Sequence, residues 1–382
     1  MGDWGDFYYG RSCPKWSVTE DATIPCIRYG ELYTKFEAKI DRVYSYTNMP
    51  PENLRFSKGT EVLIPRVGEN PMDYNHCTWL SMKDVAIGEM ISVFNTDNNP
   101  LFTATMFNAT LQNEFAMRVE GGSVTNLYFE KLKNIDVSFP SIREQEMIAA
   151  YFENIDNLIT LHQRKCDETK KLKKFMLQKM FPKKDAKKPE IRFAGFTNDW
   201  EQRKLMEVAE YRNGKAHENE INDDGEYIVV NSKFVSTNGE IRKFSYAQNE
   251  PLYENEIAFV LSDVPNGRAI ARTFLVDKSG KYTLNQRIAG ITPHEDTDPY
   301  YLYIKMNRNE YFLKFDDGNK QTNLSIKDVL NYEDMYPSYK EQQKIGMYFQ
   351  QLDHLITLHQ RKCDELKEFK KYMLQNMFPQ KG

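Results

Sequence analysis

Two long stretches of the chain carry apolar residues at alternating spacings of four and three, and each predicts an amphipathic helix. The first runs from Glu144 to Gln178 without proline or glycine, which corresponds to about 50 Å at 1.5 Å per residue. The 4-3 spacing is typical of a coiled-coil seam. The predicted seam residues are Ile155, Ile159, His162, Cys166, Thr169, Leu172, Met176 and Met180 in the first stretch and Leu352, Ile356, His359, Cys363, Leu366, Phe369, Met373 and Met377 in the second.

The ends of both stretches carry matching start and stop signals. Ser141-x-x-Glu144 and Ser338-x-x-Glu341 are predicted capping boxes, in which each side chain satisfies a free backbone N–H of the first turn. Pro182 and Pro379 follow the last turns, because proline cannot continue a helix. The second stretch also contains Gly346, which we expect to weaken it slightly.

Two equal seams on one chain are expected to pack on each other. The sequence does not set their direction, but an antiparallel pair would relate the two halves of the chain by an approximate two-fold axis. Further leucines widen the apolar face, as they would if a third surface also packed there: Leu158, Leu161 and Leu177, with their counterparts Leu355, Leu358 and Leu374.

The helical stretches belong to an internal repeat with an offset of 197 residues. Tyr151 to Pro182 matches Tyr348 to Pro379 at 23 of 32 positions. Gly121-x-x-x-Thr-Asn-Leu127 recurs as Gly318-x-x-x-Thr-Asn-Leu324. A period this long does not suit a solenoid, so the chain contains a duplicated module.

The segments outside the repeat are rich in short β-type runs, such as Thr60–Pro65, Glu226–Val230 and Glu256–Leu261. Turn-forming residues separate these runs, at 66–70, 95–100 and 264–267. We predict an α+β protein with two mixed, strand-rich domains separated by two long antiparallel coiled-coil helices. The expected divisions are a first domain at 1–132, a helical spacer at 133–183, a second domain at 184–329 and a second spacer at 330–382.

The composition favours a reduced, cytoplasmic protein. The five cysteines form no C-x-x-C pair, no apolar run is long enough to span a membrane, and no secretory signal is visible at Met1 to Tyr9. The net charge of −4 is unfavourable for a nucleic-acid binder acting alone. However, 164–188 holds 11 Lys/Arg against 3 Asp/Glu, and this run either contacts DNA backbone or is a solvated helix face.

Few residues suggest catalysis or metal binding. His162 and Cys166, with His359 and Cys363, have zinc-ligand chemistry, but they fall in the apolar seam, where we expect packing and no metal. Asn99-Pro-Leu-Phe102 is similar to an adenine methyltransferase motif but lacks its second proline, so we interpret it as a turn. No P-loop of the form G-x-x-x-x-G-K-[ST] is present.

The repeated helices resemble the specificity subunits of type I restriction-modification systems. The resemblance rests on Leu158–Glu168 and Leu355–Glu365, both L-I-T-L-H-Q-R-K-C-D-E, and on the M-L-Q-x-M-F-P that ends each helix. The segment from Ile191 to Leu205 is similar to the start of a target-recognition domain. The resemblance implies two target-recognition domains and two modification subunits that methylate adenine. It also implies motor-nuclease subunits, with S-adenosylmethionine, ATP and Mg bound only by the partner subunits.

Residues in the predicted loops are candidates for DNA contacts, because Arg suits guanine, Asn and Gln suit adenine, and Lys holds phosphates. The competing interpretation is that Asn at turns serves backbone geometry and that surface Arg is only solvated. The candidates are Arg66, Asn70, Asn95, Asn98 and Asn99 in the first domain and Asn266, Arg268, Arg272, Asn285, Gln286, Arg287 and Lys320 in the second.

The lead-in from Ile191 to Leu205 has no full counterpart at the N-terminus, where only Asp3-Trp4 is similar to Asp199-Trp200. Two interpretations stay open: the first domain begins abruptly, or residues are missing before Met1. Either bears on the activity of the first domain.

We therefore expect a non-catalytic subunit that binds a split, asymmetric double-stranded DNA target, with one half-site for each domain. The helices would set the gap between half-sites, and their outer apolar faces would dock the modification subunits. The alternative is a helical adaptor that binds proteins without reading DNA. A self-contained nuclease or methylase is a third hypothesis, which the missing motifs oppose.

Overall fold

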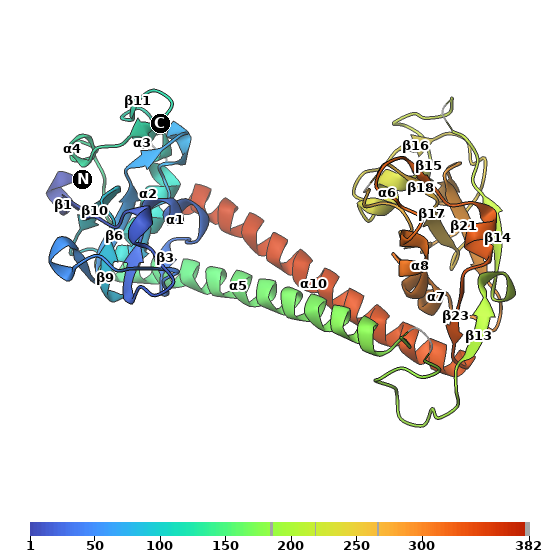
Figure 1. Cartoon of the computed structure of the whole chain (residues 1–382). Helices are drawn as coiled ribbons and strands as arrows, with labels where there is room; N and C mark the ends of the chain where they lie inside the picture. Colours follow the sequence, from blue (N-terminus) through green and yellow to red (C-terminus); the bar gives the residue numbers. More distant parts are fainter. Residues whose placement is uncertain (184–185, 218, 266, 379–382) are drawn as a thin grey trace. The chain divides into compact units, whose positions relative to one another are not determined.

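The computed structural model describes residues 1–183, 186–217, 219–265 and 267–378. The chain divides into two compact units, Met1–Gln163 with Gln360–Gly382, and Arg164–His359. The two long helices are α5 (Ile142–Lys179) and α10 (Tyr339–Met377) (Figure 1). The first part of α5 and the last part of α10 belong to unit 1, and the remainder of both helices belongs to unit 2. Asn266, one of the candidate DNA-contacting residues, lies outside the described residues.

Unit 1 is built on a five-stranded sheet of order β1-β10-β6-β8-β3, a four-stranded sheet β4-β2-β9-β5 and a small sheet β11-β12-β7. Its strands are β1 Asp6–Tyr9, β2 Ile24–Ile27, β3 Lys39–Ile40, β4 Ser45–Thr47, β5 Phe56–Lys58, β6 Glu61–Pro65, β7 Val67–Gly68, β8 Thr78–Leu80, β9 Lys83–Ile87, β10 Ile91–Asn95, β11 Glu120–Gly121 and β12 Thr125–Asn126. Its shorter helices are η1 Gly2–Trp4, η2 Lys15–Ser17, α1 Tyr29–Thr34, η3 Pro51–Asn53, η4 Pro71–Asp73, α2 Pro100–Thr110, α3 Gln112–Ala116 and α4 Phe129–Leu132.

The core of unit 1 forms where β6 and β10 pair antiparallel under helix α2. Every residue of β6 is buried, which confirms the strand predicted at Thr60–Pro65. Helix α2 buries seven consecutive residues from Leu101 to Phe107, as expected of a helix enclosed by a core. The turn predicted at Asn99 is wrong, because Asn99 is the N-cap of α2 and Pro100 occupies its first turn.

Unit 2 contains the sheets β14-β21-β17-β19, β16-β15-β20, β13-β23 and β18-β22. Its strands are β13 Glu201–Lys204, β14 Ala209–Asn213, β15 Tyr227–Val230, β16 Phe244–Ser245, β17 Ile257–Val260, β18 Ser262–Asp263, β19 Thr273–Leu275, β20 Tyr282–Leu284, β21 Ile288–Pro293, β22 Thr322–Asn323 and β23 Glu333–Tyr336. Its shorter helices are η5 Leu205–Glu207, α6 Ser232–Ser236, α7 Pro299–Met306, α8 Glu310–Leu313 and α9 Ile326–Leu330.

The two units repeat one plan. The antiparallel order β1-β10-β6 of unit 1 matches β14-β21-β17 of unit 2, and the two-strand pairing β7-β12 matches β18-β22. Helices α2 and α7 both begin at a capping side chain followed by proline, at Asn99 and Asp298. The predicted α+β class, with mixed strand-rich units and two long helices, is confirmed.

Within unit 1 the two long helices run antiparallel. Asp156 of α5 lies 2.6 Å from Lys370 of α10, and the Cys363 thiol lies 3.6 Å from Gln163, seven residues further along α5. As the residue number increases along α5, the number of the residue that it contacts on α10 decreases. The two helices therefore run in opposite directions.

Unit 2 shows the same direction. The Cys166 thiol lies 3.8 Å from the carbonyl oxygen of Ile356, and Lys173 lies 2.5 Å from Asp353. Cys166 and Cys363 are both fully buried and behave as small apolar residues. The prediction of an antiparallel pair is confirmed within each unit.

The predicted position in the seam is wrong for two residues. Leu172 is 44% exposed and Phe369 is 45% exposed. The spacing of four after Thr169 falls on Lys173, and the equivalent position of the second helix is Lys370. These lysines reach across to carboxylates of the opposite helix, so a charged pair replaces the apolar contact at this level.

The starts of the long helices differ from each other. The Glu144 amide donates to Ser141 Oγ at 3.4 Å, which is one of the two hydrogen bonds of the predicted capping box. In the second copy the Glu341 carboxylate has another partner, because it accepts two hydrogen bonds from Arg192, both 2.7 Å long. Gly346 also has a packing reason, since a Cβ there would lie 2.5 Å from the Asp298 carboxylate.

Candidate nucleic-acid interface

The pairing of β18 with β22 gathers three loops of unit 2 at one end of its main sheet. The Gln321 amide donates to Ser262 Oγ at 2.7 Å, and the Leu261 amide donates to the carbonyl of Arg287 at 3.1 Å. We call residues 262–265, 267–272, 285–287 and 316–323 the loop edge of unit 2.

Several predicted DNA-contacting residues lie on this loop edge. Arg268, Gln286, Arg287 and Lys320 are exposed. Arg272 is half-buried, and its Nε donates to the carbonyl of Arg268 at 2.6 Å. Asn285 is also half-buried, in the turn between β20 and β21. The structure therefore brings together residues that are more than 50 positions apart in the sequence.

The carboxylates at this edge are occupied by backbone amides. Asp263 accepts hydrogen bonds from the amides of Ala269 and Ile270, at 2.6 and 3.1 Å. The amide of Asn319 donates to Asp317 at 2.9 Å and is the main reason that the pKa of this carboxyl is lowered. These hydrogen bonds use the carboxylates to hold the backbone of the loops, and the Arg268 and Arg287 side chains stay exposed on the same edge.

Unit 1 has the equivalent edge around β7 and β12. The Leu127 amide donates to the carbonyl of Arg66 at 2.8 Å, as Leu324 does to Leu261 in unit 2. The Arg66 guanidinium lies 4.8 Å from the centre of the Tyr9 ring, and its Nη2 lies 2.9 Å from the Met90 sulfur. Arg66 is therefore half-buried and held in place.

The predicted asparagines of unit 1 do not form one group. Asn70 lies near Arg66 and caps η4, where the Met72 amide donates to its Oδ1 at 3.1 Å. Asn95 ends β10, and it accepts a hydrogen bond from Thr60 at 3.1 Å. It lies about 17 Å along the strand from the edge, at 3.3 to 3.4 Å per residue.

Asn98 and Asn99 follow Asn95 and hold helix α2 on α5. Gln145 donates to Asn98 Oδ1 at 2.8 Å and accepts from the amide of Asn99 at 2.9 Å. The Asn99 side chain accepts from the Phe102 amide at 2.9 Å. These contacts match the capping interpretation of asparagine at turns.

The sequence prediction missed the paired charges of the long helices. Asp156 and Lys370 pair in unit 1, and Lys173 and Asp353, their equivalents by the 197-residue offset, pair in unit 2. The signal was present in the sequence, since both residue types recur in both copies. The prediction placed Leu172 and Phe369 in the seam because they are apolar. It therefore missed the adjacent Lys173 and Lys370.

Each half of the helix pair also exposes apolar side chains outside the seam. In unit 1 these are Leu158, Phe369 and Tyr372, with exposures of 44, 45 and 60%. In unit 2 the exposed residues are Leu355, Leu172 and Phe175, which are their equivalents. We call each set of three an outer helix patch. Large apolar side chains that a protein exposes outside its core are candidates for contacts with other proteins.

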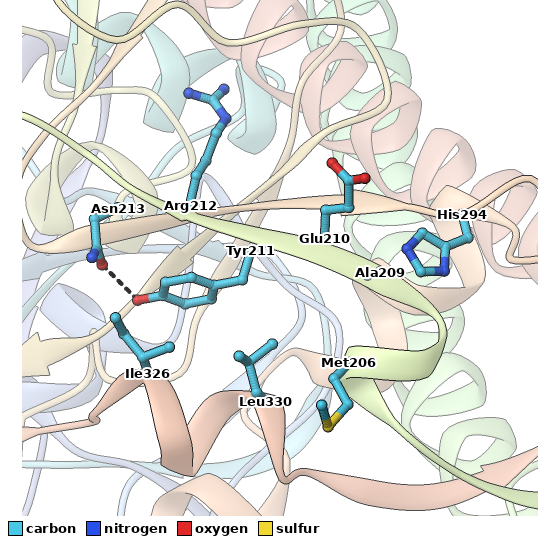
Figure 2. A pocket seen from close by; sticks show the side chains of 9 residues that line it. All are labelled: Met206, Ala209, Glu210, Tyr211, Arg212, Asn213, His294, Ile326 and Leu330. Atoms are coloured by element: carbon cyan, nitrogen blue, oxygen red, sulfur yellow. Dashed lines mark hydrogen bonds between the residues drawn. The ribbon is translucent and has the colours of Figure 1, made fainter.

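A hollow of about 560 Å³ lies beside β14 in unit 2 (Figure 2). Tyr211 on its wall donates to Asn213 at 2.7 Å. The neighbouring Arg212 is paired with Glu250 and, at 2.7 Å, with Glu256. This arginine therefore ties β14 to the rest of the unit and is not a free cation for DNA.

In the described part of the chain, no three His, Cys, Asp or Glu side chains gather as a metal site. Over the same residues, no helix is both long and apolar enough to cross a membrane.

Known proteins match this chain over most of its length. The model of the "Type I restriction modification DNA specificity domain" family matches residues 79–171 and 197–368. The MjaVIII type I restriction enzyme specificity subunit of Methanocaldococcus jannaschii is 26% identical over 276 residues, 67% of this chain and 64% of the relative. The putative MjaX specificity subunit of the same organism is 22% identical over 64% of this chain and 58% of the relative. The matches thus span about three fifths of the length of these relatives.

Solved structures agree on the fold. The S subunit of a type I restriction-modification system from M. genitalium superposes with a TM-score of 0.67 at 14% identity, over 100% of this chain and 95% of that one. A chain from a structure describing complex assembly and conformational transition of the type I R-M system gives 0.52 at 15% identity, over 98 and 95%. Since the family model covers more than half of the sequence, the chain belongs to the type I restriction modification DNA specificity domain family.

Proposed function

We propose that the chain is the DNA specificity subunit of a type I restriction-modification complex and that it reads a split, asymmetric target, one half-site per unit. The observation that carries this proposal is that the scaffold is repeated and the loops are not. The strand pairs β7-β12 and β18-β22 are equivalent, but the loops that they join differ in sequence. Different loops on equivalent supports would read different bases, because loops on a rigid scaffold commonly carry recognition.

On the loop edge of unit 2, Arg268 and Arg287 are the proposed base-reading residues, since an arginine can bind guanine through two hydrogen bonds. Lys320 is proposed to hold phosphate. Arg272, Asn285 and Gln286, which lie on the same edge, stay proposed contacts. Asn266 lies outside the described residues and stays a proposed contact from the sequence alone. In unit 1 the equivalent proposal falls on Arg66 and Asn70.

DNA contacts by Asn95, Asn98 and Asn99 stay predictions, but the positions of these residues in unit 1 argue against such contacts. The latter two side chains already accept or donate hydrogen bonds that fix α2 and α5. Their removal would disturb the packing of unit 1 before it changed any base preference.

Chemistry would come from partner subunits in this proposal. Two modification subunits would supply S-adenosylmethionine-dependent adenine methylation, and motor-nuclease subunits would use ATP and Mg to cut DNA in the cytoplasm. The outer helix patches are the proposed docking sites for the modification subunits. Their presence in both units, on equivalent residues, suits two copies of one partner.

The deciding experiment maps N6-methyladenine across a genome in cells that express the modification subunit with this chain. A new split motif should appear only with the chain. Replacing Arg268, Arg287 and Lys320 together with alanine should alter or abolish recognition of one half-site and leave the other half unchanged. If both halves changed, or if the motif were unaffected, the assignment of this edge would be wrong.

The docking proposal is tested by co-purification. Leu172→Ala with Phe175→Ala should reduce the modification subunit bound to the chain from two copies towards one. Lys174→Ala, an exposed neighbour on the same helix, is the control. The adaptor alternative predicts partner binding without any sequence-specific methylation or DNA binding.

A further inference from the structure

The hollow beside β14 in unit 2 has an equivalent place in unit 1, which the strand register identifies. Phe7 of β1 pairs with Phe94 of β10, and Tyr211 of β14 pairs with Ile291 of β21. Phe94 and Ile291 are equivalent by the 197-residue offset of the repeat. Phe7 therefore corresponds to Tyr211, which lines the hollow.

In unit 1 the chain fills this place with its own side chains. The Phe129 ring of α4 stacks on the Phe7 ring, with ring centres 5.6 Å apart and an angle of 9° between the planes. The centre of the Tyr9 ring lies 4.4 Å from that of Phe129. The Lys133 ammonium lies 5.2 Å from the centre of the same ring. The place in unit 1 thus holds an aromatic ring with a cation beside it.

Other residue types stand at these positions in unit 2. By the 197-residue offset, Ile326 of α9 takes the place of Phe129 and Leu330 takes the place of Lys133. Figure 2 shows the Tyr211 ring lying over Ile326 and Leu330. Ile326 is 46% exposed. The hollow of about 560 Å³ therefore lies where unit 1 holds its ring and its cation.

Carboxylates border one end of the hollow. Figure 2 shows Glu210 beside His294, at the end away from Asn213. Glu210 is exposed, and so are Glu207 and Glu295. His294 Nδ1 lies 3.3 Å from the carbonyl oxygen of Glu207, so these stretches of chain adjoin. Opposite charges attract, so this end favours a cation and disfavours the phosphates of a nucleic acid.

The cations near this end do not cancel its negative charge. Arg203 and Arg212 are already paired with other carboxylates. Lys204 and Lys327 can offset at most two of the three exposed glutamates. The surroundings of the hollow therefore stay acidic.

We propose that the hollow of unit 2 binds an aromatic side chain that a partner protein presents next to a lysine or arginine. The ring would take the place that Phe129 has in unit 1 and pack on Tyr211 and Ile326. The adjacent cation would face Glu210. Trp, Tyr and Arg are enriched among the residues that carry most of the binding energy of protein interfaces. The proposal goes beyond DNA reading and does not depend on it, so methylation mapping and the following tests can fail separately.

The first test uses the tripeptide acetyl-Lys-Trp-Lys-amide, with 5-fluorotryptophan as its ring, titrated with the full chain and followed by fluorine-19 NMR. We expect saturable binding at one site on the chain. The tripeptide acetyl-Glu-Trp-Glu-amide should bind more weakly by about fivefold, because its charges meet the acidic end. Glu210→Gln should reduce this difference between the two tripeptides.

Ile326→Phe is the decisive variant for this titration. It places in unit 2 the ring that unit 1 has at Phe129, and it should weaken binding of the lysine tripeptide by about tenfold. Ile326→Val is the matched control and should leave the affinity within about twofold. Both variants should keep the melting temperature, since Ile326 is half exposed. Absence of saturable binding, or equal binding by Ile326→Phe, overturns the proposal.

The second test identifies the occupant in cells. A benzophenone amino acid at position 327, exposed beside Ile326, should cross-link a partner protein on illumination. Mass spectrometry should place the cross-link on a segment with an aromatic residue next to lysine or arginine, and Ile326→Phe should reduce its yield. Cross-links only to DNA, to a second copy of this chain or to a segment without that pair overturn the proposal, as does the absence of any cross-link.

Discussion

The Lys370 ammonium lies 2.6 Å from the Asp156 carboxylate between the two long helices, and Lys173 pairs with Asp353 in the same way at 2.5 Å. Burial raises the pKa of Asp156 despite the neighbouring lysine, which shows that this charge is partly withdrawn from water. A polar pair inside an apolar seam costs stability relative to good apolar packing, but it specifies register. These pairs favour the antiparallel alignment seen in both units.

Removing one partner of the pair should destabilise unit 1. We expect Lys370→Ala or Asp156→Ala to lower the free energy of unfolding by about 1–3 kcal/mol, because the other charge is left partly buried. Urea denaturation of the full chain measures this. The reversed pair, Asp156→Lys with Lys370→Asp, should recover part of the loss. Lys371→Ala, on the exposed face, should change stability by less than about 0.5 kcal/mol.

Arg192→Ala should be more costly than the loss of an exposed pair. Its partner Glu341 is almost fully buried, and an unpaired buried carboxylate costs about 3–5 kcal/mol. The comparison is Asp296→Ala, which removes a 2.8 Å pair with Arg203 at a carboxylate that is 56% exposed, and which should cost about 1 kcal/mol or less. Equal effects in thermal unfolding would contradict this ranking.

Gly346→Ala should destabilise unit 2, although alanine is the better helix former. The added Cβ would approach the Asp298 carboxylate to 2.5 Å and disturb the cap of α7. We expect a loss of about 1–3 kcal/mol, typical of overpacking. Gln350→Ala on the exposed side of the same helix should be neutral. A stabilising Gly346→Ala would show that α7 moves aside easily.

Asn99→Ala should reduce stability by about 1–2 kcal/mol, since it removes the N-cap of α2. Asn99→Asp should retain the cap and most of the stability. The DNA motif recognised by the assembled complex should stay the same for Asn99→Asp, because the side chain is predicted to act through helix α2. A changed motif with unchanged stability would indicate that Asn99 contacts DNA directly.

We expect the carboxyl group of Glu190 to have an unusually low pKa. Hydrogen bonds from Lys179 and then Lys183 lower its pKa from 4.5 to about 2. A carboxyl with a lowered folded pKa contributes stability above its unfolded pKa and loses it as the pH falls. The contribution should therefore be present above about pH 4.5 and disappear towards pH 2. Carbon-13 NMR titration of the side chain measures this, and a midpoint near 4.5 would show that the pairs do not persist in solution.

Much of the architecture could be predicted from the sequence. The 4-3 spacing, Pro182 and the uninterrupted run from Glu144 to Gln178 identified the helices, because helix periodicity and proline geometry are local properties. The buried strand at Thr60–Pro65 was equally visible, because Val62, Leu63 and Ile64 form a short β-type run. The duplication required nothing beyond comparison of the chain with itself.

Other features depend on tertiary contacts. Spacing alone could not reveal that Lys173 and Lys370 occupy the seam, because their partners lie on the other helix. Nor could local sequence separate the asparagines, since Asn70 lies near the equivalent edge of unit 1 and Asn99 caps a helix.

By itself, the sequence determined that this protein has a duplicated scaffold of helices and two different strand-rich units, since these follow from repeat and periodicity. Only the tertiary structure decided which residues face each other. Strand register brought Arg268, Arg287 and Lys320 to one edge, and the fold of unit 2 placed Arg192 on the buried Glu341. The physical reason is that contacts between distant residues depend on packing and register, which a local pattern does not contain.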